Sequence, residues 1–462
     1  MRAIGRALGI CALAACAGGA APTRAPDGSL AGTWRGSAVF QGARLDLSIR
    51  FSQEGGTLRA AMSSPELLML EQPLAGVESA GRQVRFVTTD DHPLRFEGEV
   101  NGDSLRGTAV VPAVPGVVEA GGTAPPLRFS LGRARAPDLP PYSAHEVRFA
   151  SGRARLAGTV YVPDAGPAPR AGIVLLQGSS TNLRSDYRFY ADHFARAGLA
   201  VLAFDKRGAG ESSGDYGAAT YDTLAGDAAA AVECLRATRG VDAQRVGVWG
   251  LSQGAFISPL VAARVPSLRF IVAISAPGMP IGESAAYQDS MRLASAGFDA
   301  ADIQRTVSLD RRLQAWLGTR RDSNELSALL AEAATTPWRR ASSLPERLPS
   351  GAALAGWYWR GRTLDPAPWW RAVRVPVLAV YGAADELVPA KPSARLVEHA
   401  LRQGGNRDVT VRVFPAANHV LRTLPLVAGG RWDWPRAAPG YLESVTSWVL
   451  ERSGPGASPR HR

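Results

Sequence analysis

The chain has 462 residues, of which 46% are hydrophobic and 20% are charged. This balance is typical of globular proteins and excludes a mainly disordered chain, and the length favours two or three domains over a single core. The formal net charge of +11 comes almost entirely from scattered arginines, since Lys206 and Lys391 are the only lysines. The arginines form no dense basic cluster, so we expect a mildly basic surface and no nucleic-acid partner.

Residues 1–28 have the features of an export signal followed by a linker. Arg2 precedes an apolar run and a stretch of small residues. The stretch LAAC that ends at Cys16 resembles the lipobox of bacterial lipoproteins, which implies that Cys16 is lipidated and anchors the exported protein to a membrane. Ala17 is not the acidic residue that retains lipoproteins in the inner membrane, so the resemblance implies the periplasmic side of the outer membrane. Ordinary signal cleavage near residues 17–21, with Cys16 discarded, is the alternative.

Residues 29–132 show the period-two pattern of β-strands. Apolar residues alternate with polar ones at Leu45, Leu47, Ile49 and Phe51, and glycines separate similar short runs further on. This pattern predicts a small antiparallel β domain. Its opening stretch, GTWRG at residues 32–36, resembles the start of the lipocalin-like β-modules that precede some exported hydrolases. A structural or docking module and a lipid-binding pocket both remain open interpretations.

A Pro- and Arg-rich linker, residues 133–142, separates this module from residues 143–452, and residues 453–462 form a polar tail. In the long segment, apolar runs alternate with helical patterns, which predicts a largely parallel α/β sheet covered on both faces. The apolar runs are residues 173–176, 199–204, 245–249, 270–274, 376–381 and 409–414. Residues 281–372 carry helical patterns without a convincing strand, so we expect a helical cap insertion there.

Two segments match the pattern Gly-x-Ser-x-Gly, which is the signature of a strained turn that exposes a nucleophilic serine. Ser252 lies between a predicted strand and a predicted helix, as such a turn requires, whereas Ser212 lies in a loop. We therefore predict Ser252 as the nucleophile. The backbone N–H of Gln253, the residue after it, is then one donor to an oxyanion.

A serine nucleophile needs a base and an acid that orients the base. His419 follows the last predicted strand, where a short loop brings a side chain to the edge of the sheet. Asp385 lies in the loop after the strand at residues 376–381, with Glu386 as the alternative acid. The chain order Ser252, Asp385, His419 is the one expected when such a turn follows a parallel strand.

Taken together, residues 143–451 resemble the α/β-hydrolase family, and most closely its bacterial esterase and serine-aminopeptidase-like branch. The resemblance rests on the motifs at residues 205–212, 250–254, 382–389 and 418–419 in this order. It implies that the backbone N–H of Ser179, or of Ser180, is the second oxyanion donor, with Gln177 where the family usually has His. It also implies that residues 205–212 form a structural turn without chemistry.

Metal and nucleotide cofactors have no motif in this sequence. There is no Cys or His pair at ligand spacing and no phosphate-binding Gly-x-x-x-x-Gly-Lys motif. We therefore expect hydrolysis of a small carboxylic ester, with a short to medium acyl group, without a cofactor.

Two other functions remain possible. One is an exported aminopeptidase-like amide hydrolase, in which Glu283, Asp289 or Asp310 would bind the substrate's amino group. The other is a non-catalytic envelope binding lipoprotein.

Aromatic residues are concentrated in the predicted cap. They either hold the cap together or line an acyl pocket, and both interpretations remain open. These residues are Trp338, Trp357, Tyr358, Trp359, Trp369 and Trp370.

Overall fold

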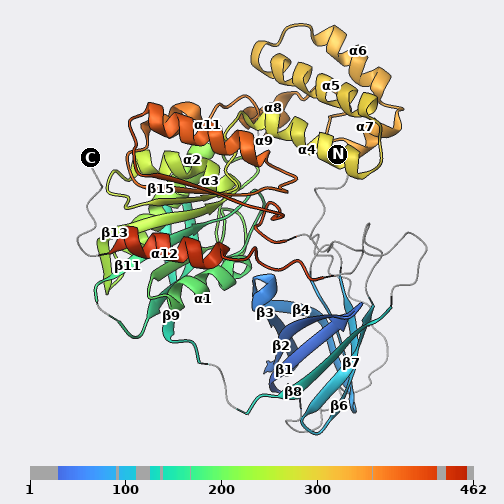
Figure 1. The fold of residues 1–462 in the computed structure, drawn as a ribbon, viewed down its shortest axis with the longest axis vertical. Coiled ribbons are helices and arrows are strands. Elements are labelled where there is room, and N and C mark those ends of the chain that lie inside the picture. Colours follow the sequence, from blue (N-terminus) through green and yellow to red (C-terminus); the bar gives the residue numbers. More distant parts are fainter. Residues whose placement is uncertain are drawn as a thin grey trace.

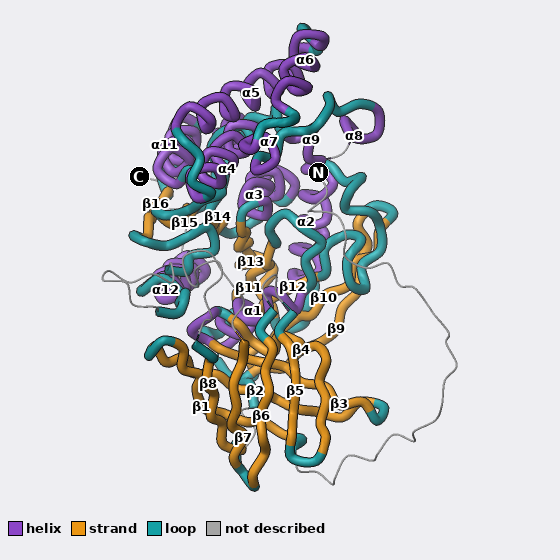
Figure 2. Tube along the Cα trace, turned by 90° about the vertical axis from the view of Figure 1, so that its right-hand side faces the viewer, coloured by secondary structure: helices purple, strands orange, loops and turns teal. Residues whose placement is uncertain are grey.

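The computed structural model describes seven stretches of the chain, residues 30–89, 93–110, 125–135, 139–166, 168–355, 357–423 and 433–454. They form a β-barrel, an α/β domain and a helical cap, with the barrel and the cap at opposite ends of the molecule (Figures 1 and 2). Cys16 lies outside the described residues, so its lipidation stays a prediction from the sequence. Within the described stretches, no helix combines the length and the apolar character that crossing a membrane requires.

The N-terminal module is a closed antiparallel barrel of eight strands, in which β1 pairs with both β2 and β8. The strands are β1 (Gly32–Phe40), β2 (Ala43–Glu54), β3 (Thr57–Ser64), β4 (Met69–Ala80), β5 (Gln83–Val87), β6 (Arg95–Asn101), β7 (Ser104–Val110) and β8 (Leu127–Arg133). Their alternating burial follows the alternating sequence, because successive side chains of a strand point to opposite faces. The predicted antiparallel β domain is therefore confirmed.

Aromatic rings occupy the centre of the barrel. The ring of Phe86 stacks on that of Phe96 at 4.9 Å between centroids, and Phe51 and Phe129 pack edge-on or tilted against this pair. An eight-stranded barrel is only wide enough for side chains to fill it or for one small ligand. This packing favours the structural interpretation of the module over the lipid-binding one.

The α/β domain is built on an eight-stranded sheet with the order β16-β15-β14-β13-β11-β12-β10-β9, in which β10 runs opposite to its neighbours. The strands are β9 (Tyr142–Ser151), β10 (Ala154–Pro163), β11 (Arg170–Leu176), β12 (Ala200–Phe204), β13 (Val241–Leu251), β14 (Ile271–Ile274), β15 (Val377–Gly382) and β16 (Val409–Phe414). Each predicted apolar run coincides with a strand. The strand order reverses between β11 and β13, and ligands of open α/β sheets bind at such a point.

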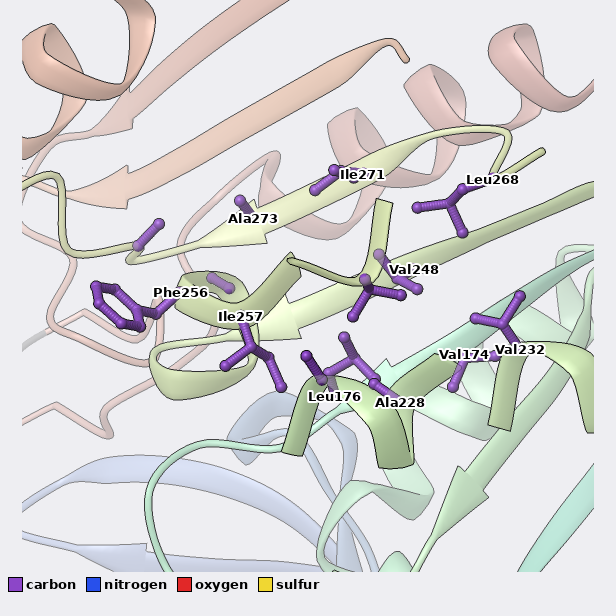
Figure 3. Packing of buried hydrophobic residues seen from close by; sticks show 14 of the residues in the cluster. Val174, Leu176, Ala228, Val232, Val248, Phe256, Ile257, Leu268, Ile271 and Ala273 are labelled. Carbon is purple, nitrogen blue, oxygen red and sulfur yellow. The ribbon is translucent and has the colours of Figure 1, made fainter. Parts of the chain in front are cut away.

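Helices cover both faces of this sheet. One face packs on α1 (Arg188–Arg196) and α12 (Tyr441–Ser453). The other packs on α2 (Tyr221–Arg236), α3 (Gln253–Arg264) and α11 (Ala390–Gln403). Figure 3 shows this second apolar layer, where strand residues such as Val174 and Val248 meet Val232 of α2 and Ile257 of α3.

The segment between β14 and β15 is helical, as predicted. Its helices are α4 (Ile281–Ser295), α5 (Ala300–Thr319), α6 (Ser323–Ala333), α7 (Pro337–Ala341), α8 (Gly351–Ala355), α9 (Trp357–Gly361) and α10 (Ala367–Ala372). Trp338 and Trp359 are buried with cap leucines in a cluster of the cap itself. Trp370 of α10 is instead buried in the core of the sheet.

A short segment between His419 and α12 connects the α/β domain to the barrel. We call residues 433–438 the docking strap. Trp434 is buried in the barrel's apolar cluster and donates from Nε1 to the carbonyl of Ala43 at 3.1 Å. Arg436 pairs with Glu66 of the barrel. The barrel is thus attached to the chain segment that follows His419.

Candidate active site

Ser252 occupies a strained turn between β13 and α3. Its backbone has φ 54° and ψ −111°, a conformation that costs energy for any residue with a side chain. The two flanking glycines allow the close packing of this turn: a Cβ on Gly250 would lie 2.5 Å from the backbone of Gly254, and one on Gly254 would overlap the Leu176 carbonyl. Ser252 is partly exposed, at the sheet edge where the strand order reverses.

Ser212, the other serine in a Gly-x-Ser-x-Gly match, lies in a different environment. It is buried, its hydroxyl donates to the Asp205 carbonyl at 2.7 Å, and it accepts from the Ala157 N–H at 2.9 Å. Both interactions are with the backbone of neighbouring strands and loops. Ser212 therefore fixes the turn after β12 and does not lie on a strand-to-helix turn.

His419 and Asp385 form a buried pair at the same edge of the sheet. Nδ1 of His419 lies 2.9 Å from Oδ2 and 3.0 Å from Oδ1 of Asp385, and the two residues are 6% and 1% exposed. The N–H groups of Leu387 and Val388 also donate to Oδ1, each at 2.8 Å. With Nδ1 held by the carboxylate, Nε2 is the ring nitrogen left for a reacting group.

Glu386, the alternative acid, is exposed and is not the partner of His419. The neighbouring strand adds a contact that the sequence did not reveal. Ser275, which follows β14 and is fully buried, donates from Oγ to the backbone carbonyl of His419 at 2.8 Å. The His419 loop is therefore fixed from both its side chain and its backbone.

The loop after β11 lies against Ser252 from the other side. A Cβ built on Gly178 would lie 3.8 Å from the Cβ of Ser252. The Gly178 N–H donates to the Tyr187 hydroxyl at 2.8 Å, and the side chain of Gln177 donates to the carbonyl of Phe204. Gln177 thus anchors this loop to β12, which gives the residue a structural role where the family usually has His.

The two predicted oxyanion donors belong to the segments that meet here. Ser179 follows Gly178 and is exposed at the surface of the loop. The N–H of Gln253 is the first of helix α3, and the first N–H groups of a helix have no partner within the helix. The partial positive charge at a helix N-terminus also favours an anion.

Lys206 lies directly behind these segments and was missed by the sequence analysis, which gave residues 205–212 no chemistry. Its ammonium donates to the Gly178 carbonyl and, at 2.7 Å, to Oε1 of Gln253. Burial lowers the pKa of Lys206 to about 7. The only signal in the sequence was its rarity, since Lys391 is the one other lysine.

The first cap helix contacts the loop that carries Asp385. The Tyr287 hydroxyl of α4 donates to the Asp385 carbonyl at 2.8 Å, and Gln288 donates to the Leu387 carbonyl at 3.0 Å. Trp369 packs edge-on against Phe256 of α3 at 5.3 Å between ring centroids. The cap therefore borders the site through α4 and α10.

Among the residues that the structure describes, no group of three His, Cys, Asp or Glu side chains could hold a metal ion.

Comparison with known proteins identifies the family to which the α/β domain is similar. Residues 167–423, more than half of the chain, match the family model of serine aminopeptidase S33. The esterase FrsA of Pectobacterium atrosepticum is 41% identical over 75 residues, which are 16% of this chain and 18% of that protein. An uncharacterized 31.7 kDa protein of Escherichia coli is 35% identical over 65 residues, 14% of this chain and 23% of that one. The chain thus spans less than a quarter of the length of these curated relatives.

Solved structures with a similar fold include the esterase PF2001 of Pyrococcus furiosus, at 17% identity and a TM-score of 0.42 over 69% of this chain and 94% of that one. The hypothetical protein PA2218 of Pseudomonas aeruginosa is similar at 19% identity and a TM-score of 0.42, over 69% and 96% of the two chains. The match of the family model over residues 167–423 and the α/β architecture lead to one assignment. The chain belongs to the serine aminopeptidase S33 family of α/β-hydrolases.

Proposed function

We propose that this protein hydrolyses carboxylic esters through an acyl-enzyme intermediate. Ser252 is the nucleophile, His419 the general base and Asp385 the group that orients His419. The observation that carries the proposal is the buried pair of Asp385 and His419, which lies at the same sheet edge as the strained turn of Ser252. A base held by a buried carboxylate at the same sheet edge as a partly exposed serine is the arrangement that activates a hydroxyl for acyl transfer.

In the first half of the reaction, Oγ of Ser252 attacks the ester carbonyl carbon while Nε2 of His419 accepts the hydroxyl proton. The electron pair of the carbonyl moves to its oxygen, which the N–H groups of Gln253 and Ser179 stabilise. Collapse of this intermediate breaks the bond to the alkoxide. The His419 imidazolium returns its proton to that leaving group, and the alcohol departs.

In the second half, water attacks the acyl-enzyme and His419 accepts a proton from it. The new tetrahedral intermediate expels Oγ of Ser252, which takes the proton back from the imidazolium. The products are one alcohol and one carboxylic acid, and no cofactor is consumed. The Asp385 carboxylate stays ionised throughout and stabilises the positive charge that His419 carries in both halves.

Ester hydrolysis is favoured over aminopeptidase activity by the ion pairs of the cap. A peptidase that binds a free amino terminus needs a carboxylate for the substrate's ammonium group. Asp310 pairs with Arg362 and Asp289 pairs with Arg292 at 2.7 Å. Glu283 lies 3.3 Å from Arg311. Each of these candidate carboxylates therefore already has a guanidinium partner. The name of the Pectobacterium relative, an esterase, also supports the proposal of ester hydrolysis.

The proposed substrates are esters with short to medium acyl chains, with Trp369 of the cap as the aromatic side chain that borders the site. Trp359 is buried in the cap's own cluster, whereas Trp369 is only partly buried and contacts the helix that starts after Ser252. Each buried methylene contributes about 0.8 kcal/mol, so kcat/KM is expected to rise with acyl length until the pocket is full. A series of p-nitrophenyl esters from acetate to decanoate measures this, and a steady rise to the longest ester contradicts the proposed range.

Replacement of Ser252 and of Ser212 by alanine tests which of the two serines is the nucleophile. We expect Ser252→Ala and His419→Ala each to lower kcat by about 10⁴-fold or more, because the members of such a unit act together. Ser212→Ala is the matched control, since it lies in the same five-residue pattern without a strained turn. Full activity of Ser252→Ala, or loss of activity in a folded Ser212→Ala protein alone, rules the assignment out.

A further inference from the structure

Lys206 connects the two backbone segments that carry the proposed oxyanion donors. It follows β12, is only 5% exposed, and its ammonium binds the carbonyl of Gly178 on one segment. On the other segment it donates to Oε1 of Gln253 at 2.7 Å. The oxygen of that amide is the atom that must face Lys206, because an ammonium group has donors only. One buried cation therefore contacts both sides of the oxyanion site.

The contact with Gly178 has a specific electronic consequence. The carbonyl of Gly178 and the N–H of Ser179 belong to one planar peptide group and point in opposite directions. A cation at the carbonyl oxygen draws electron density from the amide, which makes the N–H at the other end a stronger donor. It also fixes the plane of this peptide. The preceding peptide is fixed in turn, because the Gly178 N–H donates to the Tyr187 hydroxyl.

We propose that protonated Lys206 is a positioning residue that orients and polarises the Gly178–Ser179 peptide group for the developing oxyanion. The inference rests on the proposed ester hydrolysis and adds a residue that acts through the backbone, without touching the substrate. It also makes the activity depend on the protonation of Lys206. The protonated state of Lys206 is then required for full activity, which produces a falling limb of the pH profile on its alkaline side.

The charged or titratable groups that face Lys206 are Asp227 and Tyr216. Burial lowers the pKa of Lys206 to about 7, and Asp227 opposes this shift. Asp227 is itself paired with Arg207 at 2.9 Å. The ring of Tyr216 lies 4.7 Å from the ammonium, and burial raises the pKa of its phenol to about 12, so this group stays neutral.

Asp205, the neighbour of Lys206 in the chain, directs its carboxylate elsewhere. It pairs with Arg184 at 3.3 Å and accepts from the backbone N–H groups of Arg184 and Glu211. Because the active form of Lys206 is the protonated one, activity falls as the pH rises through the pKa of Lys206.

The two-lysine composition makes a direct test possible. Protein labelled with carbon-13 at the ε-carbon of lysine gives two resonances, from Lys206 and from the exposed Lys391. We expect the resonance of Lys206 to titrate near pH 7. Lys391→Met removes the second resonance and so assigns the first. The profile of kcat/KM for a p-nitrophenyl ester, from about pH 5 to about pH 10, should fall with the pKa of the first resonance.

Lys206→Met removes the charge and keeps most of the side-chain volume. We expect kcat to fall about tenfold with little change in KM, a smaller loss than the hundredfold or more that loss of an oxyanion donor itself causes. The falling limb of the pH profile should disappear. Lys391→Met is the matched control and should keep both the rate and the limb.

The outcomes separate this inference from the proposed function. If Ser252→Ala keeps its activity, the proposed ester hydrolysis by Ser252 is wrong, and the inference about Lys206 falls with it. If Ser252→Ala is inactive but folded Lys206→Met keeps wild-type kcat, or loses rate with an unchanged pH profile, Lys206 has only a structural role. If Lys206→Met does not fold, the wild-type titration still decides: a Lys206 resonance that titrates far from the falling limb overturns the inference.

Discussion

Two serines at the ends of neighbouring strands have left-handed backbone conformations, with φ 54° at Ser252 and φ 50° at Ser275. Such conformations are costly for residues with a Cβ and persist where the surrounding structure holds them, often near functional sites. At Ser252 the strain presents a hydroxyl at the sheet edge. At Ser275 it directs the hydroxyl toward the His419 carbonyl. The second serine thus supports the loop that carries the proposed base.

Ser275→Ala removes the hydroxyl that donates to the His419 carbonyl and so tests whether Ser275 supports the His419 loop. The change leaves the buried carbonyl of His419 without this donor, which costs about 1–3 kcal/mol of folding free energy, and it loosens the loop. We expect a lower melting temperature and a reduced kcat with KM nearly unchanged. Ser258→Ala is the matched control, because its hydroxyl donates to Gly254 within the same helix at 2.8 Å. If the two variants have the same kcat, Ser275 does not position His419.

At the scale of the elements, the strands and loops of the α/β domain were predictable because their signals are local. Continuous apolar runs predicted the strands β11 to β16. Asp385 and His419 were predicted as the acid and the base because each follows such a run. The roles of Lys206 and Ser275 could not be predicted in the same way. Each depends on a backbone carbonyl from a loop far away in the chain, and no spacing in the sequence reports such a contact.

The cap contains a buried ion pair between α5 and the turn after α9. Asp310 and Arg362 are both about fully buried, with side chains 2% and 1% exposed, and the ring of Trp359 lies 5.6 Å from the guanidinium. Burial raises the pKa of Asp310 from 3.8 to about 6, against the opposing effect of Arg362. The pair therefore holds the cap helices together at a cost in desolvation.

This pair predicts a pH dependence of stability with a definite sign. Between about pH 4 and about pH 6 the unfolded chain has lost the Asp310 proton while the folded protein retains it, so stability falls as the pH rises. Relative to Asp310→Asn, the wild type should lose about 3 kcal/mol of unfolding free energy across this window. Denaturant unfolding at both pH values measures the difference. Glu325→Gln, a change at an exposed cap carboxylate, keeps Asp310 and should therefore lose stability across this window as the wild type does. An equal pH dependence in Asp310→Asn and Glu325→Gln contradicts the assignment.

At the scale of the whole molecule, the barrel and the proposed base are mechanically connected. The docking strap, residues 433–438, contacts the barrel through Trp434 and Arg436. On its other side it pairs with the segment just after His419: Thr423 donates to the Arg436 carbonyl at 2.7 Å, and Ala438 donates to the Leu421 carbonyl at 2.8 Å. The barrel is thus connected through the docking strap to the backbone just after His419. We therefore expect the barrel to help hold the His419 loop in place.

Trp434→Ala tests this role of the barrel. Removal of a buried indole costs about 3–5 kcal/mol, and loss of this anchor should free the strap and with it the backbone at Leu421. We expect kcat to fall by about tenfold or more at a temperature where the variant is still folded, with KM less affected, because a base displaced by about 1 Å can cost up to a hundredfold. Trp434→Phe keeps most of the apolar contact and loses the bond to Ala43, so its kcat should stay nearer to the wild-type value than that of Trp434→Ala. A destabilised Trp434→Ala protein with wild-type kcat would show that the barrel is attached to the His419 loop without positioning it.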